Sequence, residues 1–201
     1  MLFSMSTMDK KKYQAVSDAV GSAFNVELSQ QVKTLTKPID YSQKNNSIIK
    51  FEFAKFVEEQ LKHEIENGLL EIDIKENGLI IRFPEKVTFP SASAKLNTKF
   101  SPVLNKVGTV LLRTEGKIFV SGHTDNQPIQ TSQYRSNWDL SASRAVSVIH
   151  RIINEVNIES SRFVVQGFAD TKPMVKNNSH SNRAINRRVE IFMEKNNISE
   201  K

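Results

Sequence analysis

The sequence predicts an α+β fold in which a mixed sheet has helices packed on one face and follows an N-terminal helix and a linker. Two neighbouring segments alternate apolar and polar residues and are joined by Asn77 and Gly78, which is the strongest local signal for a β-hairpin. After this hairpin, helical and strand periodicities alternate to the end of the chain. Such alternation is typical of a mixed sheet covered by helices.

These periodicities give the order of the elements. Strands are expected at residues 70–74, 79–83, 117–122, 162–168 and 188–194. Helices are expected at residues 49–65, 103–111 and about 137–157. Asn67 and Gly68 are expected to end the first helix and Gly116 the second. Ser136 and Asp139 have the spacing of a capping box at the start of the third helix.

The chain divides into three segments. Residues 1–24 form an amphipathic segment whose apolar positions recur at helical spacing, namely Met8, Tyr13, Val16, Val20 and Phe24. Residues 25–47 lose this periodicity and are mostly polar, which predicts a flexible linker. Residues 48–201 contain the remaining periodic segments and are expected to form one domain with its own N-terminal helix.

Composition limits the classes of function. The net charge of +6 favours an anionic partner, such as nucleic acid, a phospholipid surface or an acidic cell-wall polymer. Dispersed Lys and Arg residues without interleaved aromatic residues disfavour nucleic acid. The absence of cysteine excludes disulfides, thiolate zinc sites and cysteine nucleophiles. No apolar run approaches the roughly 18 residues of a membrane span, so the chain as given is expected to be soluble and to carry no export signal.

A candidate binding site lies where a strand gives way to a polar loop and a long helix. Thr124 and Asp125 follow the strand expected at 117–122, and Asn137 and Arg144 lie in the first turns of the helix. Ligands often bind at such strand ends and helix starts. Asp125 can accept from an ammonium group, and Arg144 can hold a carboxylate with two parallel hydrogen bonds. The pair therefore suits a zwitterionic amino-acid end.

The helix start also carries a motif of seven residues, Asn137, Leu140, Ser141, Arg144, Ala145, Val148 and Ile152. It resembles the peptidoglycan-association motif of the OmpA-like domain family, and residues 122–125 and 186–190 resemble the flanking signatures of that family. The resemblance implies a β-α-β-α-β fold that is not an enzyme, needs no cofactor and binds the diaminopimelate of the stem peptide. It implies that Arg144 pairs with a ligand carboxylate and Asp125 with the ammonium, while Thr124, Asn137 and Arg188 line the pocket.

The loop at residues 125–138 is longer than in many members and is similar to that of the flagellar stator B subunits, the group of MotB, PomB and the lateral-flagellar proteins. This similarity implies that residues 1–24 act as a plug of an ion channel. It also implies a periplasmic homodimer whose parent is anchored in the inner membrane by a helix absent from this chain. The stator A subunit would be the partner of that helix.

Other interpretations stay open at this point. Asp125 and Arg144 can form an ordinary salt bridge, which contributes only about 0 to 1 kcal/mol when exposed. Arg188 can be solvated or internally paired, and Asn137 can simply occupy the first helical turn. The order Ser121, His123 and Asp125 does not give the geometry of a catalytic triad, and His123 with Asp125 lacks the spacing of a metal site. A general envelope tether and a peptidoglycan hydrolase are the alternative functions.

Overall fold

The computed structural model describes residues 41–75 and 77–194, and it describes side chains from residue 53 onward. The predicted amphipathic segment, with Met8, Tyr13, Val16, Val20 and Phe24, lies outside the described residues, and so do residues 25–40 of the predicted linker. Within the described part, no helix has both the length and the apolar composition needed to cross a membrane.

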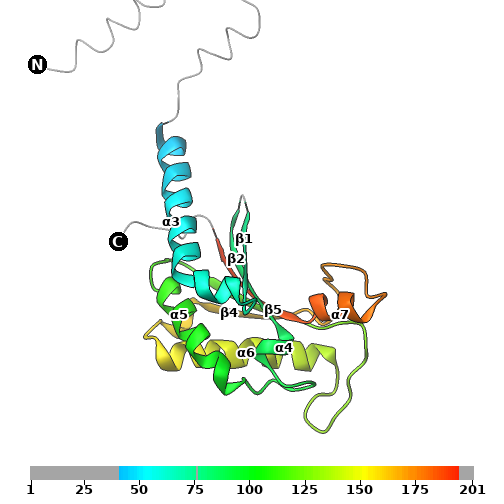
Figure 1. Cartoon of the computed structure of the whole chain (residues 1–201). Coiled ribbons are helices and arrows are strands. Elements are labelled where there is room, and N and C mark those ends of the chain that lie inside the picture. Colours follow the sequence, from blue (N-terminus) through cyan, green and yellow to red (C-terminus); the bar gives the residue numbers. More distant parts are fainter. Residues whose placement is uncertain (1–40, 76, 195–201) are drawn as a thin grey trace, which may run out of the picture. The chain divides into compact units, whose positions relative to one another are not determined.

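A five-stranded mixed sheet forms the centre of the domain (Figure 1). The strands are β1 (Glu71–Lys75), β2 (Gly78–Pro84), β3 (Ile118–His123), β4 (Phe163–Gly167) and β5 (Arg188–Glu194). Their order across the sheet is β1-β2-β5-β3-β4, and all neighbours are antiparallel except β3 and β4. The last strand in the sequence therefore lies in the middle of the sheet, between β2 and β3.

Strands β1 and β2 form the hairpin that Asn77 and Gly78 predicted. Lys75 pairs with Gly78 across the turn, and the register continues to Glu71 opposite Arg82. A Cβ atom on Gly78 would lie 2.1 Å from the Met193 carbonyl oxygen of β5. Glycine is therefore required here because the backbones of β2 and β5 approach closely.

Helices α5 (Ser101–Leu111) and α6 (Asn137–Glu155) cover one face of the sheet, and α6 lies against β3 and β4 (Figure 1). Apolar side chains from α5, α6 and the sheet share one core with side chains of α3 (Tyr41–Glu66), for example Leu61, Leu104 and Ile152. Strand residues that alternate along β2, β3 and β5 complete this core, because every second side chain points to the helices. The predicted fold class is confirmed.

The predicted boundaries of the first helix are half right. Gly68 has a φ of 64° and donates its backbone N–H to Ile65, so the expected end at Asn67 and Gly68 is confirmed. The start is wrong, because α3 begins at Tyr41 and so includes residues 41–47, which the polar sequence assigns to the linker. A helix shows an apolar stripe only where it buries a face, so a polar sequence does not exclude helix.

Two details of helix ends are also corrected. Helix α5 ends at Leu111, whereas Gly116, with a φ of 73°, lies in the turn before β3. Ser136 precedes α6 but its side chain makes no capping hydrogen bond. The expected capping box is absent because the Asp139 carboxylate accepts instead from the backbone N and the Nε of Arg135, at 3.1 and 2.8 Å. Two single turns of 3-10 helix, Thr98–Phe100 and Ser160–Arg162, precede α5 and β4.

Candidate functional site

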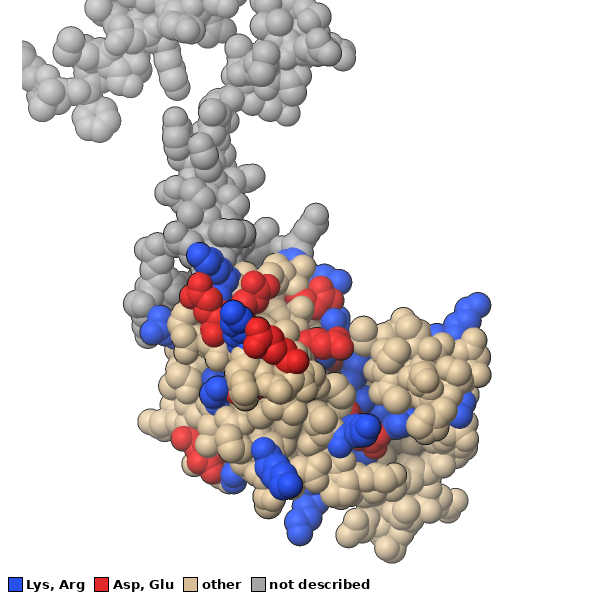
Figure 2. All heavy atoms as spheres, viewed as in Figure 1, with Lys and Arg blue, Asp and Glu red and all other residues tan. Residues whose placement is uncertain are grey.

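A cavity of about 1060 Å³ opens at the end of the sheet where β3 finishes and α6 begins. Its walls come from α4 (Glu85–Thr88) and the loop after it, the loop after β3, the first turns of α6, and α7 (His180–Asn186). Figure 2 shows basic and acidic side chains adjoining one another in the recess beside α7. Thr124, Asp125, Asn137 and Arg144 all line this cavity, so the structure brings four of the five predicted site residues together.

Thr124 and Asp125 directly follow β3, and several hydrogen bonds fix their conformation. The backbone N–H of Thr124 donates to the Ala169 carbonyl at 2.8 Å, which ties the end of β3 to the loop after β4. Its hydroxyl donates to the Asp125 carbonyl at 2.9 Å. Asp125 is buried, and its Oδ1 accepts from the backbone N–H of Gln127 at 2.9 Å, closing a local turn. The second carboxylate oxygen, Oδ2, is left for a partner across the cavity.

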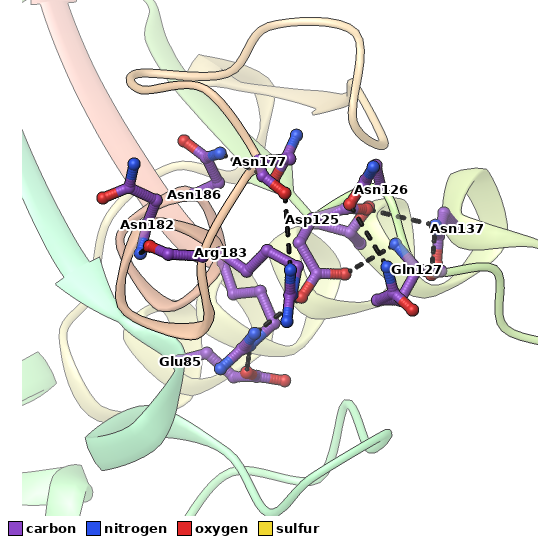
Figure 3. Close-up of polar contacts among 12 residues, drawn as sticks. Glu85, Asp125, Asn126, Gln127, Asn137, Asn177, Asn182, Arg183 and Asn186 are labelled. Carbon is purple, nitrogen blue, oxygen red and sulfur yellow. Dashed lines mark hydrogen bonds and ion pairs between the residues drawn. The ribbon is translucent and has the colours of Figure 1, made fainter.

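That partner is Arg187, and it belongs to a chain of four alternating charges. Arg187 Nη1 donates to Asp125 Oδ2 at 2.6 Å, and Arg187 Nε donates to Glu85 Oε2. The other oxygen of Glu85, Oε1, accepts from Arg144 Nη2. Figure 3 shows guanidinium side chains between the labelled Glu85 and Asp125. Asp125 and Arg144 thus share one cavity but are joined through Glu85 and Arg187, with no direct ion pair between them.

Arg144 is held deep in the wall. The residue is 1% exposed; its Nε donates to the Ser93 carbonyl at 2.9 Å, and its guanidinium lies 5.2 Å from the centre of the Phe89 ring. Burial lowers the pKa of the Arg144 guanidinium from its ordinary value, and the attraction of Glu85 opposes that shift. A buried guanidinium with one carboxylate and one carbonyl partner is a rigidly oriented donor.

Arg187 is more accessible, with 24% of its side chain exposed. Burial alone would lower its pKa, but the hydrogen bonds to Asp125 and Glu85 outweigh burial and raise it. Neither Glu85 nor Arg187 is among the site residues that the sequence predicts. The pattern at 186–190 contains two adjacent arginines, and which of them enters the cavity depends on where β5 starts.

The expectation that Arg188 lines the pocket is wrong, because Arg188 is not among the residues of the cavity wall. It is 6% exposed, and its Nε donates to Glu190 Oε1 at 2.7 Å while its Nη1 donates to the Asn186 carbonyl at 3.0 Å. Arg188 and Glu190 are two residues apart on β5 and share the sheet face opposite the core residue Val189. Arg187 precedes β5, so the alternation of side chains along the strand does not set the direction of its side chain.

Asn137 starts α6 and also lines the cavity. It occupies the first turn of α6, and its Nδ2 donates to the Gln127 carbonyl at 2.9 Å and the Asp125 carbonyl at 3.3 Å. Figure 3 shows Asn137 facing Gln127 and Asp125 across the loop. Asn137 therefore fastens the loop after β3 to the start of α6 while forming part of the cavity wall.

His123 lies behind the site on the opposite face of the sheet. It is 2% exposed, its ring centroid is 5.3 Å from that of Phe168, and its Nε2 is 3.3 Å from Ser121 Oγ. Burial, with a smaller contribution from the positive charge of Arg188, lowers the His123 pKa to about 4. The histidine is therefore neutral near pH 7.

Comparison with known proteins shows the family. A family model described as the OmpA family matches residues 88–187, the stretch that contains Asp125, Asn137, Arg144 and Arg187. The chain belongs to the OmpA family. Glu85, which lines the same cavity, lies just outside the matched region.

The proteins similar to this OmpA-family chain include an uncharacterized protein, a motility protein and a cell wall anchor. It is 31% identical to the uncharacterized protein YtxE of Bacillus subtilis over 97% of this chain and 81% of that protein. It is 30% identical to motility protein B of Bacillus subtilis over 72% of this chain, but it spans only 54% of that relative. The solved cell wall anchor of the T6SS from Pseudomonas aeruginosa has 33% identity and a TM-score of 0.65, covering 69% of this chain and 96% of that one.

Proposed function

We propose that the domain holds the peptide part of bacterial peptidoglycan without covalent chemistry, through the cavity beside α6. The observation that carries this proposal is the alternating chain of Arg144, Glu85, Arg187 and Asp125 in the cavity wall. Buried charges of both signs at one opening suit a ligand that itself carries both signs. The similarity to a solved cell wall anchor supports a ligand in the cell wall.

The stem-peptide residue that fits best is diaminopimelate, because it offers an ammonium and a carboxylate on one carbon. Its carboxylate would accept from the guanidinium groups of Arg144 and Arg187, and its ammonium would donate to Asp125. Thr124 and Asn137 act by fixing the loop that presents Asp125. Charge-assisted hydrogen bonds of this kind are roughly twice as strong as neutral ones, so a few contacts suffice for retention.

We further propose that the parent protein is a flagellar stator B subunit, in which this domain is the periplasmic wall anchor. The similarity to motility protein B supports this proposal. In such a protein, residues 1–24 would form the plug, a homodimer would pair with the stator A subunit through inner-membrane helices, and the wall contact would resist the torque reaction. Residues 25–40 would set how far the anchor reaches.

Retention on purified sacculi tests the anchor. The variant Asp125→Asn keeps the shape of the side chain but removes its charge and places an amide against Arg187, so we expect at least a tenfold loss of sacculus-bound protein. Asp170→Asn is the matched control, because Asp170 is an exposed residue in the loop after β4. Equal retention of both variants, with unchanged circular dichroism, would show that the cavity is not the wall-binding site.

A general envelope tether is the second candidate, favoured by the similarity to the cell wall anchor of the T6SS. Deleting the codons for residues 8–24 in the membrane-containing parent gene separates the two candidates. A stator that has lost its plug should leak ions and slow growth, whereas a tether should show no leak. Release of soluble muropeptides from the sacculi during the retention assay would instead indicate a hydrolase.

A further inference from the structure

Glu85 occupies a central place in the cavity wall that nothing in the sequence indicated. It begins α4 directly after β2, and its backbone N–H donates to the Arg187 carbonyl at 2.9 Å. Each of its carboxylate oxygens accepts from a different arginine, Oε1 from Arg144 and Oε2 from Arg187. Its side chain is 12% exposed. Glu85 is therefore fixed by main chain and side chain together, between the two guanidinium groups.

Each of the two arginines keeps one terminal nitrogen that makes no hydrogen bond to a residue the structure describes. Arg144 uses Nε and Nη2, and Arg187 uses Nε and Nη1. Arg144 Nη1 and Arg187 Nη2 have no acceptor among the residues that the structure describes. Both arginines line the cavity, so these two nitrogens are the donors available to an incoming carboxylate.

The formal charges of the four side chains cancel. Two guanidinium cations, Arg144 and Arg187, alternate with two carboxylates, Glu85 and Asp125. A zwitterion that enters this set leaves the local charge unchanged. Without Glu85, one excess positive charge would remain, and two like charges would lie side by side, so a simple anion would gain affinity relative to a zwitterion.

We propose that Glu85 determines the ligand class of this cavity: it positions the two arginines for a carboxylate and cancels enough positive charge that an amino acid is preferred over a plain dicarboxylate. This inference rests on the proposed wall-binding function and adds to it a specificity-determining residue. Glu85 acts through the arginines, so it is a positioning residue whose removal changes preference as well as affinity.

Competition on sacculi measures the preference directly. The full 201-residue chain is bound to sacculi and displaced with diaminopimelate or with pimelate, which has the same carbon chain and both carboxylates but no amino groups. Wild-type protein should be displaced at lower concentration by diaminopimelate. In Glu85→Gln, the ratio of the two displacing concentrations should move towards pimelate by about tenfold, because the site gains one positive charge.

Two further variants complete the test. Arg187→Gln changes the local charge in the opposite direction, so pimelate should compete even less well relative to diaminopimelate than in wild type. Glu155→Gln removes a carboxylate that pairs with Arg151 near the end of α6 and should keep the wild-type ratio. Thermal unfolding of each variant separates loss of fold from change of preference.

The outcomes distinguish this inference from the function on which it rests. If the wild-type chain is not retained on sacculi, the proposed function is wrong and the inference falls with it. If wild type is retained and Glu85→Gln keeps the wild-type ratio, the inference is wrong while the function stands. Should Glu85→Gln fail to fold, Arg187→Gln decides, since an unchanged ratio in that variant overturns the charge argument.

Discussion

Lowering the pH from 7.5 to 5 should destabilise this domain through one residue, His123. The buried imidazole has a pKa of about 4 in the fold and an ordinary value of 6.5. As the pH falls below 6.5, the unfolded chain takes up a proton that the folded chain does not, so acid favours the unfolded state. The contribution of His123 to the free energy of unfolding is fully present above pH 6.5 and is lost progressively towards pH 4. Between pH 7.5 and 5 the loss is about 2 kcal/mol.

The assay is urea unfolding at both pH values, for wild type and for His123→Phe, which keeps an aromatic ring beside Phe168 without a titrating group. Wild type should lose about 2 kcal/mol, a large part of the 5–15 kcal/mol typical of a domain, and the variant should lose much less. Asp73 and Glu190 do not interfere, because their pKa values are lowered and both stay ionised at pH 5. His150→Gln, at an exposed position, is the control. An equal loss in wild type and His123→Phe would refute the argument.

Three further predictions concern packing, strain and charge. Gly122→Ala should lower the free energy of unfolding by about 3 kcal/mol, because the new Cβ would lie 1.9 Å from the Ser141 carbonyl oxygen of α6; a urea midpoint equal to wild type would contradict this. Ala92→Gly should raise it by about 0.5 kcal/mol, since Ala92 has a φ of 53° that glycine adopts freely, and a lower melting temperature would count against it. Arg188→Gln should cost about 2 kcal/mol by weakening the buried pair with Glu190. The folded fraction of Arg188→Gln should nevertheless be retained on sacculi as well as wild type. A loss of retention would show that Arg188 takes part in binding.

The elements that local sequence signals define were predictable. Asn77 and Gly78 marked the hairpin, and the motif from Asn137 to Ile152 marked α6 and the position of Arg144. These signals act within a few residues, where spacing and backbone preference suffice. The cavity position of Asp125 followed from its place after the strand expected at 117–122, because ligands often bind where such a strand end meets a helix start.

The charge chain was only half predictable, because it depends on contacts between distant segments. Glu85 lies in a stretch between two predicted elements, and only the folded sheet places it between arginines 59 and 102 residues away. Which of Arg187 and Arg188 lines the cavity depends on the residue at which β5 starts. A sequence-based prediction places strand boundaries only to within a few residues. A shift of one residue exchanges the two faces of a strand.

The central position of β5 bears on how the domain withstands pulling. Arg187, at the cavity, is followed directly by β5, whose seven residues pair with β2 on one side and whose first six pair with β3 on the other. A load taken up at Arg187 therefore enters the sheet at a strand clamped along both edges. Drawing β5 lengthwise out of the sheet shears two ladders of hydrogen bonds at once, whereas an edge strand such as β4 would peel from a single neighbour.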